Sequence, residues 1–164
     1  VQDVYRFEIL DKMRGRFSVS RLETMFDDLL SGNGKAFSEL LGGYLRDLVS
    51  VYDTANKESF YHGFVLGMTA LFVSDYIIES NRESGYGRFD LAIIPKDVSK
   101  AGVIMEFKVA SREADMAAKA KEALQQIEER EYVTEFRQRG IQRVWKYGIA
   151  FCGKKILAFQ GPMC

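Results

Sequence analysis

Two short apolar segments joined by a brief connection constrain the fold of this chain more than any other feature. The segments are Phe89–Pro95 and Gly102–Val109, and each has the length and the composition of a β-strand. The connection, residues 96–101, is too short for a parallel crossover, so the simplest arrangement is an antiparallel hairpin. A turn centred on Val98 then fixes the register of the two strands.

This register sorts the side chains onto two faces. The pairs expected on the first face are all apolar: Phe89 with Phe107, Leu91 with Met105, and Ile93 with Val103. On the second face, Asp90 lies opposite Glu106. Directly opposed Cβ atoms are about 4.5–5.5 Å apart, and like charges there are destabilising, so the two carboxylates predict a cation between them. Lys108 follows on the same face, and two acids with a lysine are typical of a Mg²⁺ site.

A salt-bridge cluster is the alternative interpretation of the same residues. Arg88 is expected opposite Lys108, and these two bases would neutralise both acids without a metal. Ala92 and Ile104 are also opposed on this face and are apolar. A helix is therefore expected to cover that part of the sheet, which favours a functional site at its charged end. The hairpin alone leaves both interpretations open.

The wider sequence around the two acids resembles a known family. Residues 80–90 (SNRESGYGRFD), followed by residues 106–108 (EFK), are similar to the PD-(D/E)XK nuclease superfamily. They most resemble its subfamily found C-terminal to AAA-ATPase-like domains in bacterial proteins. Glu58–Phe64 and Ala123–Ile127, with Tyr132 beyond them, also fit that subfamily in the same order.

The resemblance implies a restriction-endonuclease-like fold, an α/β (mixed α+β) sheet flanked by helices. We expect this core over residues 55–164 and a helical extension over residues 1–54, together one compact domain. The periodicity predicts helices near 20–31, 35–52, 56–72 and 112–137, and strands at 73–79, 144–152 and 155–160 in addition to the hairpin. Ser18 or Ser20 would cap the first helix, Ser111 the last, and 155–160 would be an edge strand.

The resemblance also implies a chemistry: hydrolysis of phosphodiester bonds in nucleic acid, with DNA favoured. Asp90 and Glu106, with the backbone carbonyl of Phe107, would hold Mg²⁺ or Mn²⁺. Lys108 would orient the attacking water and stabilise the charged phosphate.

Five more residues near these motifs are candidates for supporting roles. In the family the glutamate of the first core helix approaches the metal, so Glu58 is a candidate third carboxylate; alternatively it is an acid favoured by the helix dipole. Gln126 would contact the active-site end, and Arg88 and Tyr132 would bind substrate. An unbroken helix would place Tyr132 about 240° round from Gln126. His62, the only histidine, suits packing or hydrogen bonding.

Net charge, cysteine spacing and the length of apolar runs limit which partners and which cellular location we expect. The formal net charge is zero, so positive surface for nucleic acid must be local. A candidate patch follows the glutamine-containing helix: Arg130, Arg137, Arg139, Arg143 and Lys146. With two cysteines in no metal or disulfide spacing, and no apolar run long enough for a membrane span, a cytoplasmic domain is expected.

The chain begins without methionine, which suggests a piece of a longer protein whose N-terminal part would be the AAA-ATPase-like domain. The oligomeric state is left open, including a homodimer. Two other classes of function also stay open: a catalytically silent module that binds nucleic acid or a partner for an attached ATPase, and an assembly domain that uses the first two helices as its interface.

Overall fold

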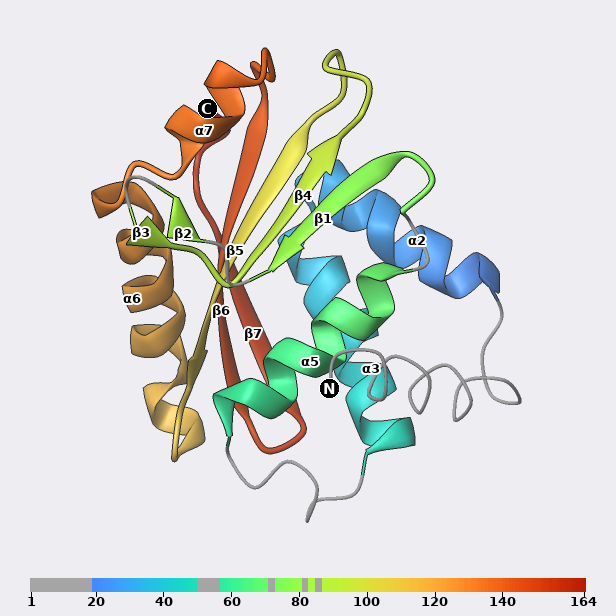
Figure 1. Ribbon diagram of the computed structural model, residues 1–164. Coiled ribbons are helices and arrows are strands. Elements are labelled where there is room, and N and C mark those ends of the chain that lie inside the picture. The colour runs from blue at the N-terminus through green and yellow to red at the C-terminus, as the bar shows by residue number, and fades with distance from the viewer. Residues whose placement is uncertain (1–18, 50–56, 71–72, 81–82, 85–86) are drawn as a thin grey trace.

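The computed structural model describes residues 19–49, 57–70, 73–80, 83–84 and 87–164. It has a five-stranded mixed sheet with helices on both faces (Figure 1), which confirms the predicted fold class. The sheet order is β1-β4-β5-β6-β7, and only the β5–β6 pair is parallel. The strands are β1 (Tyr76–Ser80), β4 (Leu91–Pro95), β5 (Gly102–Val109), β6 (Val144–Cys152) and β7 (Lys155–Gln160). A separate two-stranded sheet pairs β2 (Glu83–Ser84) with β3 (Gly87–Arg88).

The β4–β5 hairpin has the register that the sequence predicts. Leu91 pairs with Met105, Ala92 with Ile104, and Ile93 with Val103. The predicted pairing of Phe89 with Phe107 on one apolar face is wrong, because the chain bends at Asp90 before β4 begins. Phe89 therefore packs on the opposite face of the sheet, with the ring of Tyr132.

Among the described elements, helices pack against both faces of the sheet (Figure 1). The first face carries α2 (Val19–Leu30), α3 (Gly34–Leu48) and α5 (Glu58–Thr69), and the second carries α6 (Met116–Glu129) and α7 (Val133–Gln138), preceded by a short 3₁₀ turn, η2 (Glu113–Asp115). The expected helical pair, α2 and α3, packs on the core. Tyr147 Oη donates to the Leu29 carbonyl (2.7 Å) and Trp145 Nε1 to that of Leu30 (2.9 Å), so β6 holds the end of α2 directly.

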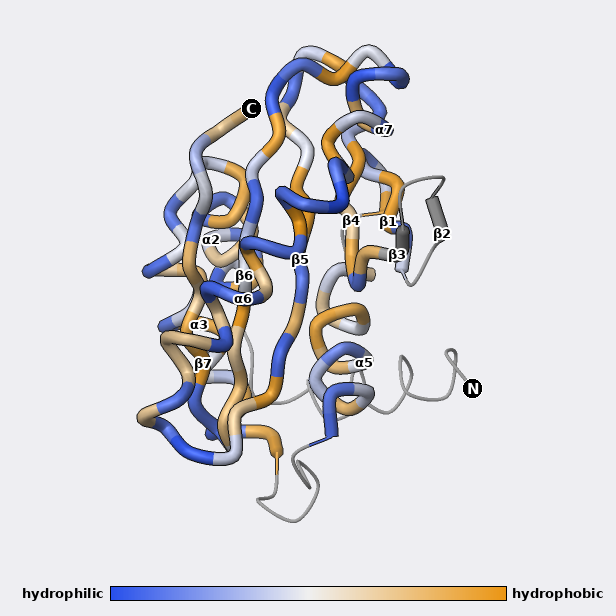
Figure 2. The backbone as a smooth tube through the Cα atoms, turned by 90° about the vertical axis from the view of Figure 1, so that its left-hand side faces the viewer, coloured by the Kyte–Doolittle hydropathy of each residue, from blue (hydrophilic) through white to orange (hydrophobic). Residues whose placement is uncertain are grey.

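The sheet separates two apolar cores because alternate side chains of a strand point to opposite faces. The first core joins β4 and β5 to α2, α3 and α5, and the second joins the other face of the same strands to α6 and α7. After a hydrophilic start, α5 is mostly hydrophobic (Figure 2), as expected for a helix between other elements. Ala92 and Ile104 lie in the second core, so helices do cover the face that carries the two acids.

Gly148 lets α6 approach β6 closely. A Cβ atom at this position would collide with the backbone of Ala120 and Leu124 in α6. Gly148 is also the β6 residue that pairs with Glu106 of β5. The missing side chain therefore brings α6 down onto the sheet beside one of the two predicted acids.

Several predicted boundaries are corrected. The single helix over 112–137 is wrong: α6 ends at Glu129, Glu131 has a positive φ of 48°, and α7 begins at Val133. Arg112 and Asp115, rather than Ser111, occupy the cap positions of η2 and α6. The strand predicted at 73–79 starts at Tyr76 after a turn.

The helix predicted over 35–52 ends at Leu48. Of the proposed extension over 1–54, residues 1–18 and 50–54 lie outside the described residues, and with them Ser18 and the last residues of that predicted helix. The last two strands have the predicted bounds, and β7 is an edge strand. No helix in the described part of the chain has the length and apolarity needed to cross a membrane.

Candidate metal centre

Asp90 lies at the bend that leads into β4, and its carboxylate is fixed by the neighbouring strand. Asp90 Oδ2 accepts a hydrogen bond from the backbone N–H of Phe107 (2.7 Å). The backbone carbonyl of Asp90 lies 2.9 Å from His62 Nε2 of α5. Asp90 is thus held at both its carboxylate and its main chain, next to the β5 segment that carries the other predicted site residues.

Glu106 is buried in β5 with only 3% of its surface exposed. Burial, followed by the negative charge of Asp90, raises its pKa from 4.5 to about 8. One carboxylate oxygen, Oε1, accepts from Gln126 Nε2, but the other, Oε2, is buried without a hydrogen-bond partner among the described residues. A buried carboxylate oxygen without a partner is costly unless the group is protonated or binds a cation.

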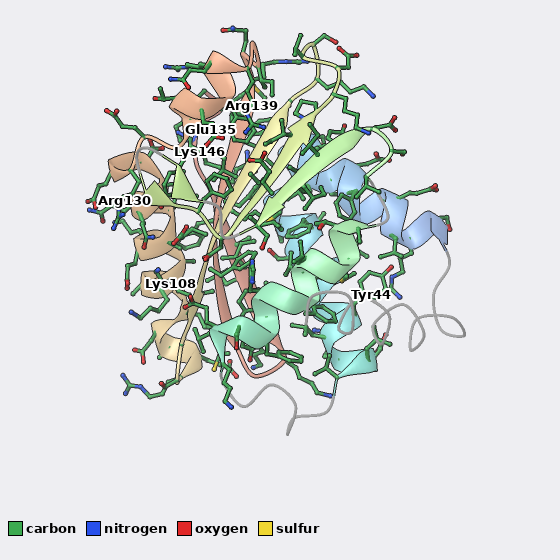
Figure 3. All side chains as sticks on the ribbon, in the orientation of Figure 1. Tyr44, Lys108, Arg130, Glu135, Arg139 and Lys146 are labelled. Carbon is green, nitrogen blue, oxygen red and sulfur yellow. The ribbon has the colours of Figure 1, made fainter. Side chains whose placement is uncertain are left out.

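Lys108 and Gln126 complete a connected set with Glu106. Lys108 Nζ donates to Gln126 Oε1 (2.9 Å) and lies 3.6 Å from Glu106 Oε1. The Gln126 amide therefore bridges the two, with its oxygen toward the ammonium and its nitrogen toward the carboxylate. The Lys108 side chain is 19% exposed, and it lies on the α6 side of the sheet (Figure 3).

Tyr132 reaches Gln126 because the helix is broken. On an unbroken helix the two side chains would point in different directions. The chain changes direction between α6 and α7, and this change brings Tyr132 back toward Gln126. Tyr132 shares a side-chain hydrogen bond with Gln126, and burial, followed by the charge of Glu106, raises the pKa of its hydroxyl. Tyr132 is 1% exposed, so in this arrangement it presents no surface to a substrate.

The donor set fits a hard divalent cation. Asp90 retains Oδ1, Glu106 has its unpartnered Oε2, and carboxylate and carbonyl oxygens are the ligands that Mg²⁺ prefers. Phe107 directs its N–H toward Asp90, and in a strand the C=O of a residue points to the same side as its N–H. The Phe107 carbonyl is therefore expected on the side of the strand that faces Asp90.

The described residues bring no third acidic ligand to the site. Across the described ranges, no three His, Cys, Asp or Glu side chains form a group able to hold a metal ion. Glu58, the predicted third carboxylate, is exposed at the first residue of α5, where an acid is favoured by the helix dipole. A cation bound by Asp90 and Glu106 would need water or substrate oxygens for its remaining positions.

Two of the basic residues predicted around the site are paired with acids elsewhere. Arg88 lies in β3, where its backbone pairs with Glu83; its side chain is outside the described part of the structure, so its contact with Lys108 stays a prediction. Lys146 is 1% exposed and bonded to Glu128, and Arg139 pairs with two glutamates, one of them the neighbouring Glu135 of α7 (Figure 3). The expected patch of five bases is therefore wrong as a single exposed surface.

The sheet order, the hairpin with its two acids, and the Glu106-Phe107-Lys108 strand define a restriction-endonuclease-like domain. A family model described as the PD-(D/E)XK nuclease superfamily matches residues 56–160, which is more than half of the chain. The chain belongs to the PD-(D/E)XK nuclease superfamily. No curated protein matches it.

Proposed function

We propose that this domain is a divalent-metal-dependent nuclease that hydrolyses phosphodiester bonds of nucleic acid, with DNA as the preferred substrate. The observation that carries the proposal is the unpartnered, buried Oε2 of Glu106 beside a second carboxylate, Asp90. Two acids placed together with a free buried oxygen are destabilising for a purely structural element and suitable for a cation.

Asp90, Glu106 and the Phe107 carbonyl would hold Mg²⁺ or Mn²⁺. When bound, such a cation supplies positive charge that offsets the phosphate oxygens and makes water a better nucleophile. The hydrogen bond from the Phe107 N–H fixes the orientation of the Asp90 carboxylate before any ligand arrives. This preorganisation lowers the cost of gathering two negative groups around one site.

We expect Lys108 to be the group that acts on the substrate. Its ammonium is partly exposed, and the Gln126 carbonyl oxygen holds it beside Glu106. From this position it would orient the attacking water and stabilise negative charge on the phosphate as that charge develops. Gln126 would hold the relative positions of the base and the acid, and the buried Tyr132 would support Gln126 rather than bind substrate.

The setting of the domain is the second part of the proposal. Its resemblance to the subfamily found behind AAA-ATPase-like domains supports a bacterial, cytoplasmic protein in which such a domain precedes this one. Arg88, next to the site in sequence, would supply positive charge for a phosphate near Lys108. The exposed fraction of Lys108 and the charge of the nucleic-acid backbone support contact at this edge of the sheet.

The test is cleavage of single- and double-stranded DNA and RNA with Mg²⁺ or Mn²⁺. Asp90→Ala and Lys108→Ala should each reduce the cleavage rate by about a hundredfold or more, because each removes a charge needed in the transition state. Asp97→Ala and Lys100→Ala are matched controls: they remove the same residue types from the exposed turn of the same hairpin and should cleave like wild type.

Two results would contradict the proposal. The first is a wild-type protein that cleaves none of the four substrates and binds no Mn²⁺ by calorimetry, which would favour a silent binding module. The second is cleavage that persists in Asp90→Ala at the wild-type rate, which would place the reaction elsewhere or attribute it to a contaminant.

A further inference from the structure

His62 connects α5 to the main chain of Asp90. Its Nε2 lies 2.9 Å from the Asp90 carbonyl oxygen and 2.9 Å from Ser80 Oγ, at the end of β1. Its ring lies against that of Phe107, with centroids 6.0 Å apart. One side chain on the first core helix therefore contacts two of the residues that form the candidate metal centre.

The Asp90 carbonyl lies outside the strand pairing of the sheet. On both sides of β4 the recorded strand pairs begin one residue later, with Leu91 opposite Ser80 and Met105. Asp90 itself lies at the bend, outside these pairs. His62 supplies the hydrogen bond that strand pairing would otherwise provide, and it does so at the residue whose carboxylate must be aimed.

The hydrogen-bond partners of His62 indicate which ring nitrogen carries a proton. A carbonyl oxygen only accepts, so a hydrogen bond to Asp90 requires the proton on His62 Nε2. Ser80 Oγ lies at the same distance and shares that donor. A protonated Nε2 has no lone pair for a metal, so this nitrogen supports the site through the backbone rather than by ligation.

We propose that His62 is a positioning residue that fixes the Asp90 main chain and, through it, the direction of the Asp90 carboxylate. The inference rests on the proposed function, since it assigns the aimed carboxylate to the metal. Two hydrogen bonds then act on one residue: His62 holds the Asp90 carbonyl, and the Phe107 N–H holds its Oδ2. Without the first, the peptide at the bend can rotate and the second is weakened.

The experiment compares three variants of the same helix. His62→Phe keeps an aromatic ring beside Phe107 but removes the donor, and His62→Gln places an amide N–H at nearly the same reach. Tyr61→Phe is the matched control: it removes a side-chain hydrogen bond to a backbone carbonyl, that of Gly153 (2.8 Å), without touching Asp90.

Two readouts are measured on each protein: Mn²⁺ affinity by calorimetry, and hydrogen exchange of the Phe107 amide in the absence of metal. His62→Phe should weaken Mn²⁺ binding about tenfold or more, as expected when a group that orients a metal ligand is lost. Its Phe107 amide should exchange about tenfold faster, because the acceptor of that N–H is no longer held. His62→Gln should restore both, and Tyr61→Phe should change neither.

The two proposals fail separately. A wild type that binds no Mn²⁺ overturns the metal site, while the amide of Phe107 still reports whether His62 holds Asp90. Unchanged Phe107 exchange in His62→Phe overturns the positioning role, as does equal weakening of Mn²⁺ binding in His62→Phe and Tyr61→Phe. Failure of His62→Gln to restore Mn²⁺ affinity also overturns it, because that result would point to the imidazole as a ligand.

Discussion

Glu106 should make the metal-free protein less stable as the pH rises, and Glu106→Gln should remove this dependence. In the folded chain burial, followed by the charge of Asp90, raises the pKa of Glu106 from 4.5 to about 8. Between these two values the folded protein holds a proton that the unfolded chain has released. Because the folded state binds more protons, the free energy of unfolding must fall as the pH increases through this window.

The size of the effect follows from the shift. At about 1.4 kcal/mol per pKa unit, moving from 4.5 to about 8 corresponds to at most about 5 kcal/mol. For a domain of this length, 1 kcal/mol changes the melting temperature by about 2–4 °C. The wild-type melting temperature should therefore fall by up to about 10–20 °C across the window. The Glu106→Gln side chain does not titrate in this range. The variant should therefore lose the Glu106 contribution to the pH dependence of stability and keep the contribution of the other groups.

The assay is thermal unfolding followed by circular dichroism, in the presence of a chelator, from about pH 4.5 to about pH 8. Glu39→Gln, which removes an exposed acid of α3, is the control and should follow the wild-type curve. Adding Mn²⁺ at the upper end of this pH range should raise the melting temperature of the wild type, because a cation favours the ionised carboxylate. It should not raise the melting temperature of Glu106→Gln.

Asp90→Asn provides a second check on the same reasoning. Its neutral side chain removes a charge that raises the pKa of Glu106, while the Asn carbonyl can still accept from the Phe107 N–H. The metal-free variant should be more stable than wild type near pH 8. Parallel melting curves for wild type and Glu106→Gln would refute the argument, since Glu106 would then be ionised and paired with Lys108 across the whole range.

Three further substitutions test the surroundings of the site. Gly148→Ala should cost about 3 kcal/mol in urea denaturation, since its Cβ collides with the backbone of α6, whereas Gly63→Ala, with open space around it, should not destabilise. Gln126→Leu should reduce the cleavage rate about tenfold or more, and Gln125→Leu, its exposed neighbour, should leave it unchanged; equal rates would exclude the bridging role. Lys146→Met should be as stable as wild type, or more stable by up to about 2 kcal/mol, and should keep full cleavage, because this buried ammonium does not reach solvent; a loss of cleavage would contradict this.

The hairpin could be predicted because its information is local. At the charged end of the hairpin, Asp90, Glu106 and Lys108 alternate with apolar residues, and a six-residue connection leaves one register that sorts the side chains onto two faces. The bounds of β6 and β7 could be predicted from the sequence for a similar reason, since Gly153 separates two largely apolar runs. The bend at Asp90 was not accessible, because no glycine or proline marks it and alternation predicts a regular strand through Phe89.

The break between α6 and α7 shows where local information ends. Residues 112–137 are rich in good helix formers, so intrinsic propensity favours one continuous helix. The structure instead places Glu131 at a positive φ and buries Tyr132 against Phe89, a residue far away in sequence. A tertiary contact has therefore overridden the intrinsic helix propensity. One signal in the sequence could have indicated this: the apolar residues Tyr132, Val133 and Phe136 do not fall on the apolar face that a continuous helix would have.

The same break explains how the buried Glu106 carboxylate can be maintained without a metal. Gln126 donates to Glu106 and accepts from Lys108, but an amide that rotates by half a turn would present its oxygen to the acid instead. Tyr132, brought back to Gln126 by the broken helix, adds a third hydrogen bond that opposes such rotation. Because the members of this set come from β5, from α6 and from the residue that precedes α7, its geometry depends on how closely α6 lies on β6. The glycine opposite Glu106 that permits this approach is therefore as important for the site as the acids themselves.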